Sequence, residues 1–340
     1  MTNTSMRVLS PAAIVLLVLS FSILSVTGQI THVPLFDGEN AYTYLVDQCD
    51  FGPRPPGSEN LSLCAGYIAV TLESFGWNIT YQNFTYQETA CSNLIATWNA
   101  TENASLVFGA HYDTRPEATS DPDPLNRTKP ILGANDGASG TAVLIELARI
   151  LSESIRSSVE FVFFDAEDSG GIAGWSWIQG STYYVSQLDS ERVDSIDAMV
   201  LVDMVGDAEL QLPRESTSTR SLQNTIWSIA NQMGYSETFL STNGGSILDD
   251  HRPFLDAGIA AVDIIHTPFP WYWHTLEDTP DKCSAESLSK VGEVLEVFIV
   301  ENANTDGTFP LDTPYLIYIG IIVAISLPII VAFYYYRKRY

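Results

Sequence analysis

The stretch VEFVFFDAED, residues 159–168, decides the fold class of this chain. Residues 159–164 are mostly apolar, and Asp165, Glu167 and Asp168 follow at once. A short apolar run bounded by polar residues is typical of a strand that is buried on both faces of a sheet. Strands of this kind predict a parallel sheet, whose ligands bind beyond the carboxyl ends of the strands.

Three other runs have the same form, at residues 105–110, 198–202 and 261–265. Segments with the apolar spacing of helices lie at residues 141–152 and 221–233. This alternation predicts an α/β domain, a three-layer αβα sandwich with a mostly parallel central sheet. Upstream, we expect helices at 41–48 and 61–75 and strands at 77–86 and 93–98.

Polar residues gather directly after the predicted strands. The set comprises His111, Asp113, Asp136, Asp165, Glu167, Asp168, Asp203 and His274. The carboxyl ends of parallel strands meet at one edge of the sheet, so we expect these side chains to lie together. So many carboxylates in one crevice would repel one another unless a cation neutralised them. Imidazole combined with carboxylate oxygen is a ligand set that suits zinc.

Each residue also has an ordinary structural interpretation. His111 alone would be a buried, hydrogen-bonded histidine, Asp136 a helix N-cap and Asp203 a turn residue at the end of a strand. The recurrence of such residues after successive buried strands favours the metal site over these separate interpretations.

Three further acids of this set have expected roles beside the metal ligands, namely Asp113, Glu167 and Asp168. We expect Asp113 to be a hydrogen-bond partner of His111 that fixes its tautomer. Glu167 and Asp168 are adjacent in sequence, so one of them would bind the metal while the other acts as a base.

These motifs together resemble the zinc aminopeptidase superfamily that also contains the glutaminyl-peptide cyclotransferases. The matching segments are His111-Tyr-Asp113, Asn135-Asp136-Gly137, residues 163–168, Leu201-Val-Asp203, residues 249–254 and Trp273-His274-Thr275. The resemblance covers about residues 52–301. It implies that Asp136, Asp168 and His274 bind zinc, that His111 and Asp203 join them if a second zinc binds, and that Glu167 is the acid/base.

Two chemistries are known within this superfamily. As a cyclotransferase, the chain would bind one zinc and convert the N-terminal glutamine of peptides to pyroglutamate with release of ammonia. As an aminopeptidase, it would bind two zinc ions and hydrolyse the N-terminal residue. Residues 269–275 and Asp249, where aminopeptidases usually carry Ser, favour the cyclotransferase. Asp168 in place of the usual Glu, and Ala110 before His111, point away from it.

In the cyclotransferase interpretation, Asp203 and Asp249 would share a proton network with Glu167. The expected aromatic wall of the substrate pocket comprises Trp175, Trp177, Phe269 and Trp273. A third alternative is a non-catalytic cell-surface receptor of the same fold. The complete set of ligands together with Glu167 argues against that alternative.

The N-terminal segment is predicted to be a signal peptide over residues 1–28. Arg7 precedes an apolar run at residues 12–26, which is short for a membrane span, so an uncleaved anchor is the second interpretation. The catalytic domain is expected at residues 29–300.

The C-terminal segment is predicted to anchor the chain in a membrane. Residues 315–336 carry no charge and are long enough to cross a bilayer of roughly 30 Å. The basic tail at 337–340 would remain cytoplasmic. The domain and a polar stalk at 301–314 are therefore expected outside the cell, in a single-pass protein of the cell membrane.

Charge and cysteine content agree with an exported protein. The chain of 340 residues carries 41 acidic and 16 basic residues, a net charge of −25 that argues against nucleic acid as a partner. An even number of cysteines in an exported chain favours disulfides, and we expect Cys64–Cys91 because these residues are close in sequence. The other cysteines are Cys49 and Cys283. Candidate glycosylation sites are Asn60, Asn78, Asn83, Asn99, Asn103 and Asn126.

Overall fold

The centre of the fold is a six-stranded sheet in the order β1-β2-β4-β3-β5-β8. The computed structural model describes residues 30, 32–98 and 104–303. Within the sheet, β4, β3, β5 and β8 run parallel, whereas β2 is antiparallel to both β1 and β4. The strands are β1 (Asn78–Tyr86), β2 (Thr89–Thr97), β3 (Leu106–His111), β4 (Val159–Phe164), β5 (Ala198–Asp203) and β8 (Ala261–Ile265). A separate parallel pair is formed by β6 (Leu212–Glu215) and β7 (Phe239–Gly245).

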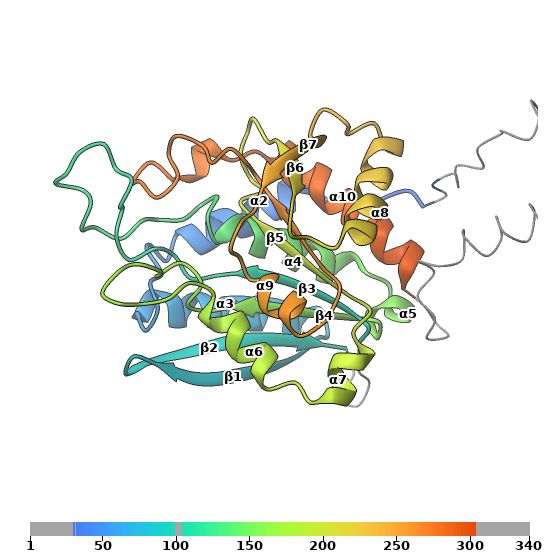
Figure 1. The fold of residues 1–340 in the computed structure, drawn as a ribbon, viewed down its shortest axis with the longest axis horizontal. Coiled ribbons are helices and arrows are strands. Elements are labelled where there is room, and N and C mark those ends of the chain that lie inside the picture. The colour runs from blue at the N-terminus through green and yellow to red at the C-terminus, as the bar shows by residue number, and fades with distance from the viewer. Residues whose placement is uncertain (1–29, 31, 99–103, 304–340) are drawn as a thin grey trace, which may run out of the picture. The chain divides into compact units, whose positions relative to one another are not determined.

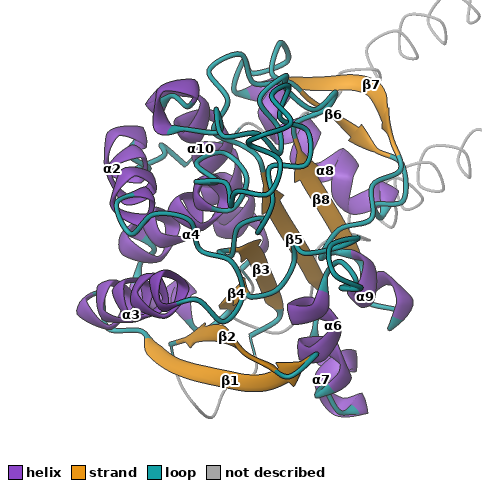
Figure 2. Cartoon of the chain, turned by 90° about the vertical axis from the view of Figure 1, so that its left-hand side faces the viewer, coloured by secondary structure: helices purple, strands orange, loops and turns teal. Residues whose placement is uncertain are grey.

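Helices cover both faces of the central sheet (Figures 1 and 2). One face is covered by α2 (Gly38–Cys49), α3 (Glu59–Ser74), α4 (Ala138–Ile150) and α10 (Ala285–Asn302). The other face is covered by α6 (Gln179–Ser186), α7 (Ser190–Ser195) and α9 (Arg252–Asp256). The remaining helices are the single turn α5 (Glu153–Arg156) and α8 (Arg220–Gln232), which packs on α10 and near β7.

Strand β4 shows why the apolar run is continuous rather than alternating. Every side chain from Val159 to Phe164 is buried, because helices lie on both faces of the sheet. Glu160 is the polar member of the run. Its carboxylate lies 3.4 Å from Arg192 and accepts a hydrogen bond from the hydroxyl of Tyr184, as a buried charge requires.

Helix α4 is held tightly against the strand ends that carry the candidate residues. A Cβ atom at Gly140 would lie 2.0 Å from the carbonyl oxygen of Val202 in β5, so glycine permits this close approach. The hydroxyl of Thr141 donates a hydrogen bond of 3.0 Å to the carbonyl oxygen of His111 in β3. The first turn of α4 is therefore fixed to two neighbouring strands.

The α/β class with a central, mostly parallel sheet is confirmed. The predicted strands at 105–110, 159–164, 198–202 and 261–265 are β3, β4, β5 and β8, with bounds that differ by at most one residue. The predicted helices at 41–48, 61–75, 141–152 and 221–233 are α2, α3, α4 and α8. The β6–β7 pair and the helices α5, α6, α7, α9 and α10 were not predicted.

The expected disulfide between Cys64 and Cys91 is not formed. All four cysteines are buried and free. Cys64 lies on the buried face of α3, whereas Cys91 lies in β2 and packs with Phe84 and Ala166. Proximity in sequence was therefore a poor guide, because the two side chains enter different parts of the core.

The expectations about the two ends of the chain concern residues that the structure mostly leaves undescribed. Among the described residues, no helix is both long and apolar enough to cross a membrane. The predicted signal peptide at 1–28, the predicted membrane span at 315–336 and the cytoplasmic tail lie outside them. The first residues of the predicted stalk belong to the end of α10.

The candidate glycosylation sites have different surroundings. Asn78 and Asn83 are exposed on β1, and Asn60 and Asn126 are half-buried. Asn99 and Asn103 lie outside the described residues.

Candidate active site and metal centre

The predicted site residues meet at the carboxyl ends of the parallel strands. His111 and Asp203 are the last residues of β3 and β5. Asp136 precedes α4, Glu167 and Asp168 follow β4, and His274 lies in the segment after β8. The prediction that these side chains lie together at this edge of the sheet is therefore confirmed, and their roles stay a prediction.

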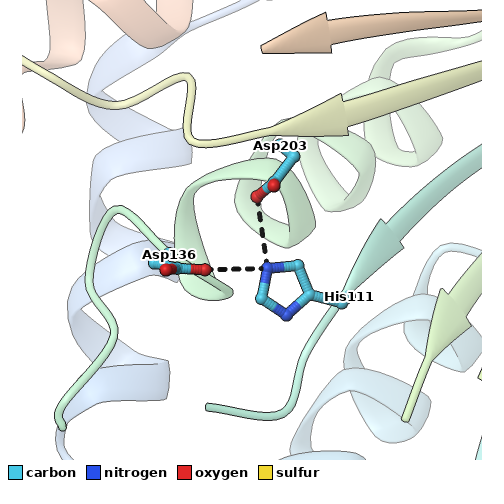
Figure 3. Close-up of side chains that lie close together, drawn as sticks. All are labelled: His111, Asp136 and Asp203. Carbon is cyan, nitrogen blue, oxygen red and sulfur yellow. Dashed lines mark hydrogen bonds and ion pairs between the residues drawn. The ribbon is translucent and has the colours of Figure 1, made fainter. Parts of the chain in front are cut away.

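One group of candidate ligands is centred on His111. Its Nε2 atom lies 3.2 Å from Oδ1 of Asp136 and 3.2 Å from Oδ1 of Asp203 (Figure 3). All three side chains are buried. Their ligand atoms lie within 4.8 Å of one another, which is close enough to hold one metal ion.

A second group shares Asp136 with the first. Nε2 of His274 lies 3.4 Å from Oδ2 of Asp136 and 3.2 Å from Oδ1 of Asp168. Asp136 therefore turns one carboxylate oxygen towards each histidine. This arrangement could hold one metal ion or a pair bridged by Asp136.

The donor atoms fit a divalent cation. Oδ2 of Asp136 and Oδ2 of Asp168 are buried and have no hydrogen-bond partner. Buried carboxylate oxygens without a partner are costly, and a bound cation would satisfy both. Histidine nitrogen with carboxylate oxygen is the ligand set of catalytic zinc sites.

The backbone is turned sharply where it presents these side chains. Ala166, Met204 and His274 have φ angles of 60°, 49° and 57°. Residues other than glycine rarely adopt this left-handed conformation, and it is found where the surrounding structure fixes a functional geometry. Here it occurs at the candidate ligand His274, at Met204 directly after Asp203, and at Ala166 directly before Glu167.

Two aspartates fix the loops that carry the ligands. Asp113 accepts hydrogen bonds from the backbone amides of Glu167 (3.1 Å) and Asp168 (3.2 Å). Its Oδ1 lies 3.5 Å from Nδ1 of His111, so its role in orienting that ring stays a prediction.

Asp278 plays the corresponding part for the loop before α4, and sequence analysis did not identify it. It accepts hydrogen bonds from the backbone amides of Asn135 (2.8 Å) and Asp136 (3.1 Å). Burial and the neighbouring Asp136 raise the pKa of Asp278 to about 7. Its only sequence signal is an acidic residue four positions after His274, which does not distinguish it from surface acids.

A cavity of about 240 Å³ opens beside the candidate ligands. Trp273 stacks on His274 with ring centroids 3.6 Å apart, and Phe269 stacks on Trp273 at 4.4 Å. The ring of Trp177 lies nearly parallel to that of His274, at 11° and 6.1 Å. The lining residues are Asp136, Glu167, Asp168, Trp177, Asp203, Met204, Ser246, Ile247, Leu248, Asp249, Ile265, Phe269, Trp273 and His274.

The expectation that Trp175 belongs to the pocket wall needs correction. Trp175 does not line the cavity and instead packs edge-on against Tyr86, at 5.1 Å between ring centroids. A turn closed by the hydrogen bond from the Gly171 amide to the Trp175 carbonyl directs this ring away from the site. Trp177, two residues later, lines the cavity.

Burial strongly perturbs the acids that line the cavity. Burial, together with Asp168 and Asp250 nearby, raises the pKa of Glu167 well above its ordinary value, although His111 opposes the effect. Burial and the neighbouring Asp263 and Asp203 raise the pKa of Asp249 in the same way. Two acids with raised pKa values at one cavity are typical of a catalytic site.

Neighbouring carboxylates raise the pKa values of the two histidines, although burial alone would lower them. Burial alone would lower the pKa of His274, but Asp168 and Asp136 raise it to about 9. Burial would likewise lower the pKa of His111, which Asp203, Asp113 and Asp136 raise well above its ordinary value. In the metal-free site the neighbouring carboxylates therefore favour the imidazolium form of both side chains, and a bound cation would displace the added proton.

An α/β domain with shared histidine–carboxylate groups at the strand ends, beside an apolar cavity that contains a perturbed acid, defines a metal-dependent enzyme. The chain belongs to peptidase family M28, whose family model matches residues 93–299. Membership of this family supports an enzyme rather than the receptor alternative.

Individual relatives carry two kinds of description. The chain is similar to glutaminyl-peptide cyclotransferase from Bos taurus, with 28% identity over 245 residues, covering 62% of this chain and 66% of that protein, just under two thirds of its length. It is similar to the structure of Bacteroides thetaiotaomicron glutaminyl cyclase bound to N-acetylhistamine, with 33% identity, a TM-score of 0.73, and coverage of 79% of this chain and 99% of that one. It is also similar to the structure of a Zn-dependent exopeptidase from Parabacteroides distasonis, with 30% identity, a TM-score of 0.72, and coverage of 79% and 99%.

Proposed function

We propose that this protein is a zinc-dependent glutaminyl-peptide cyclotransferase, which converts the N-terminal glutamine of peptides to pyroglutamate and releases ammonia. The observation that carries the proposal is Asp249. Its buried carboxyl group lines the same cavity as Glu167, has one oxygen without a hydrogen-bond partner, and has a strongly raised pKa. A hydrolase of this fold needs no acid at that position, whereas a cyclase can use one to hold a proton near its base. Relatives described as glutaminyl-peptide cyclotransferases support the same choice.

Asp136, Asp168 and His274 would hold the zinc ion, because their donor atoms converge within 4.8 Å and the free oxygens of both aspartates are buried. The bound ion would supply a Lewis acid that polarises the γ-amide carbonyl of the substrate glutamine.

Glu167 would carry the proton. Cyclisation forms a bond between the α-amine nitrogen and the γ-carbonyl carbon and breaks the bond between that carbon and the amide nitrogen. Glu167 takes the proton that the α-amine loses and delivers it to the departing nitrogen, which leaves as ammonia. A carboxyl group with a raised pKa suits this task, because it must accept and return a proton near neutral pH.

Asp203 and Asp249 would form the proton network with Glu167, and burial beside other carboxylates raises the pKa of Asp249 as this role requires. The walls formed by Trp177, Phe269 and Trp273 would keep water from the substrate amide. Exclusion of water matters because cyclisation, unlike hydrolysis, has no use for it.

One observation favours a second candidate function, a two-zinc aminopeptidase. Asp136 turns one oxygen towards each of the two histidines, as a carboxylate bridging two metal ions would. In that case Glu167 would act as base for water, and the N-terminal residue of the peptide would be cleaved.

The two candidates differ in metal content and product. We expect the purified domain to bind one zinc ion, to release ammonia from a glutaminyl peptide and to leave a leucyl peptide intact. Two zinc ions per chain with release of leucine, and no reaction on the glutaminyl peptide, would refute the cyclotransferase and support the aminopeptidase.

We further propose that the enzyme acts at the cell surface, on the basis of the apolar run at 315–336 and the basic tail that follows it. Its substrates would then be peptides or protein N-termini outside the cell.

A further inference from the structure

Arg115 makes a set of buried contacts that the proposed chemistry does not yet use. The residue is only 5% exposed. Nη1 donates to Oδ1 of Asp168 at 2.9 Å, Nη2 donates to the carbonyl oxygen of Gly170 at 3.2 Å, and Nε donates to the hydroxyl of Thr119 at 3.0 Å. The guanidinium group is thus held in one orientation against a candidate zinc ligand.

Arg115 fixes the carboxylate of Asp168 through the oxygen that faces His274, since Oδ1 also lies 3.2 Å from Nε2 of His274. Oδ1 accepts a hydrogen bond from the guanidinium group of Arg115, whereas Oδ2 is buried and has no hydrogen-bond partner. Within the described part of the chain, Arg115 is the only arginine or lysine that forms an ion pair with a candidate ligand. Its charge offsets that of Asp168, in a site otherwise crowded with acids.

The same guanidinium supports one wall of the cavity. Its Cζ atom lies 4.7 Å from the centroid of the Trp177 ring, a cation–π contact. Trp177 in turn lies nearly parallel to the ring of His274. The backbone of Gly170 packs directly against the ring of Trp177, since a Cβ atom at Gly170 would lie only 2.1 Å from that ring.

We propose that Arg115 is a positioning residue with two separable effects. Through its ion pair it fixes the orientation of the Asp168 carboxylate beside His274, and through its flat face it holds Trp177 as a wall of the substrate cavity. This inference rests on the proposed zinc enzyme, but it applies to either reaction on a peptide N-terminus.

Two substitutions separate the effects. Arg115→Met keeps the length of the side chain but removes the charge and the hydrogen bonds. We expect it to weaken zinc binding by about 10- to 100-fold, the usual cost of losing a residue that orients a metal ligand. Trp177→Leu removes the wall but leaves the ion pair with Asp168. We expect it to raise KM while zinc affinity stays at the wild-type value.

Two further variants complete the design. Arg220→Met is the matched control, because Arg220 is exposed and lies outside the cavity, and it should behave as the wild type. Arg115→Lys tests the proposal if Arg115→Met fails to fold, because lysine keeps the charge but lacks the planar fork. We expect Arg115→Lys to retain most of the zinc affinity and to raise KM.

Zinc affinity is measured by competition with a coloured chelator, and kcat and KM on whichever N-terminal substrate the wild type uses. Arg115→Met with wild-type zinc affinity, or Arg115→Lys with wild-type zinc affinity and KM, would overturn the proposal. So would a loss of zinc in Trp177→Leu as large as that in Arg115→Met. Failure of the proposed function is distinguishable, since it would show as a wild-type protein that binds no zinc or turns over no peptide.

Discussion

Replacement of Glu167 by glutamine tests the assignment of the base directly. Glutamine keeps the length and planar shape of the side chain but cannot accept the proton of the α-amine. Loss of a general base typically costs about 100- to 10,000-fold in turnover. That range corresponds to about 2.7–5.4 kcal/mol of transition-state stabilisation.

The structure also predicts what Glu167→Gln leaves intact. Glu167 is 7% exposed, and burial beside Asp168 and Asp250 disfavours its ionised form. A neutral amide relieves this crowding, so the zinc-free variant should unfold at the same temperature as the wild type or above it. The contact from the Glu167 amide to Asp113 involves the backbone and is unaffected.

The assay compares ammonia release from a glutaminyl peptide, zinc content and the midpoint of thermal unfolding. Glu209→Gln is the control, because Glu209 is exposed and lies outside the cavity. We expect Glu167→Gln to bind zinc, to fold, and to lose the acid limb of the pH–rate profile together with most of its turnover. Loss of zinc along with activity would refute the assignment, and would mean that Glu167 is a ligand and Asp168 the base.

Four other expectations can be checked with similar means. His274→Ala removes a ligand from every version of the site, so zinc content and activity should both collapse, as measured by metal analysis of the folded protein. Asp249→Ser should reduce cyclisation of a glutaminyl peptide far more than it reduces zinc content or the unfolding midpoint. Burial raises the pKa of Asp250 from 3.8 to about 7. Its contribution to the stability of the zinc-free protein is therefore fully present below about pH 4 and is lost as the pH rises through 7. The free energies of unfolding of the wild type and Asp250→Asn, measured by denaturant titration, should agree at low pH and differ at higher pH. Protease added to intact cells should release the whole domain by cutting within residues 301–314, whereas a domain protected until the membrane is broken would reverse the predicted orientation.

The sequence predicted those parts of the fold that local physics determines. Residues 159–164 are recognisable as a buried strand because both faces must be apolar, and residues 141–152 are recognisable as a helix by the helical spacing of their apolar residues. The β6–β7 pair was missed for a physical reason. β6 is short and β7 is largely exposed, so neither carries an apolar pattern, and their parallel pairing depends on distant parts of the chain.

The candidate site was predictable as a set of residues, but not in its geometry. The strand-end rule brings His111 and Asp203 together, because each must follow a buried strand of the same sheet. It says nothing about turns within loops, and for that reason Trp175 was wrongly expected in the cavity wall. It also gives no signal for Arg115 or Asp278, whose contacts join segments far apart in sequence.

The position of Asp203 links the number of zinc ions to the choice of reaction. Asp203 lies 3.2 Å from Nε2 of His111, in the group that would hold a second ion. A carboxylate bound to metal cannot also carry a shared proton, since the metal displaces it. If one zinc binds, at Asp136, Asp168 and His274, Asp203 stays available for the network with Asp249 and Glu167 that we propose for cyclisation. If two bind, that network is broken and the site is arranged for water instead. The zinc content of the wild-type protein therefore tests the proton network as well as the metal site.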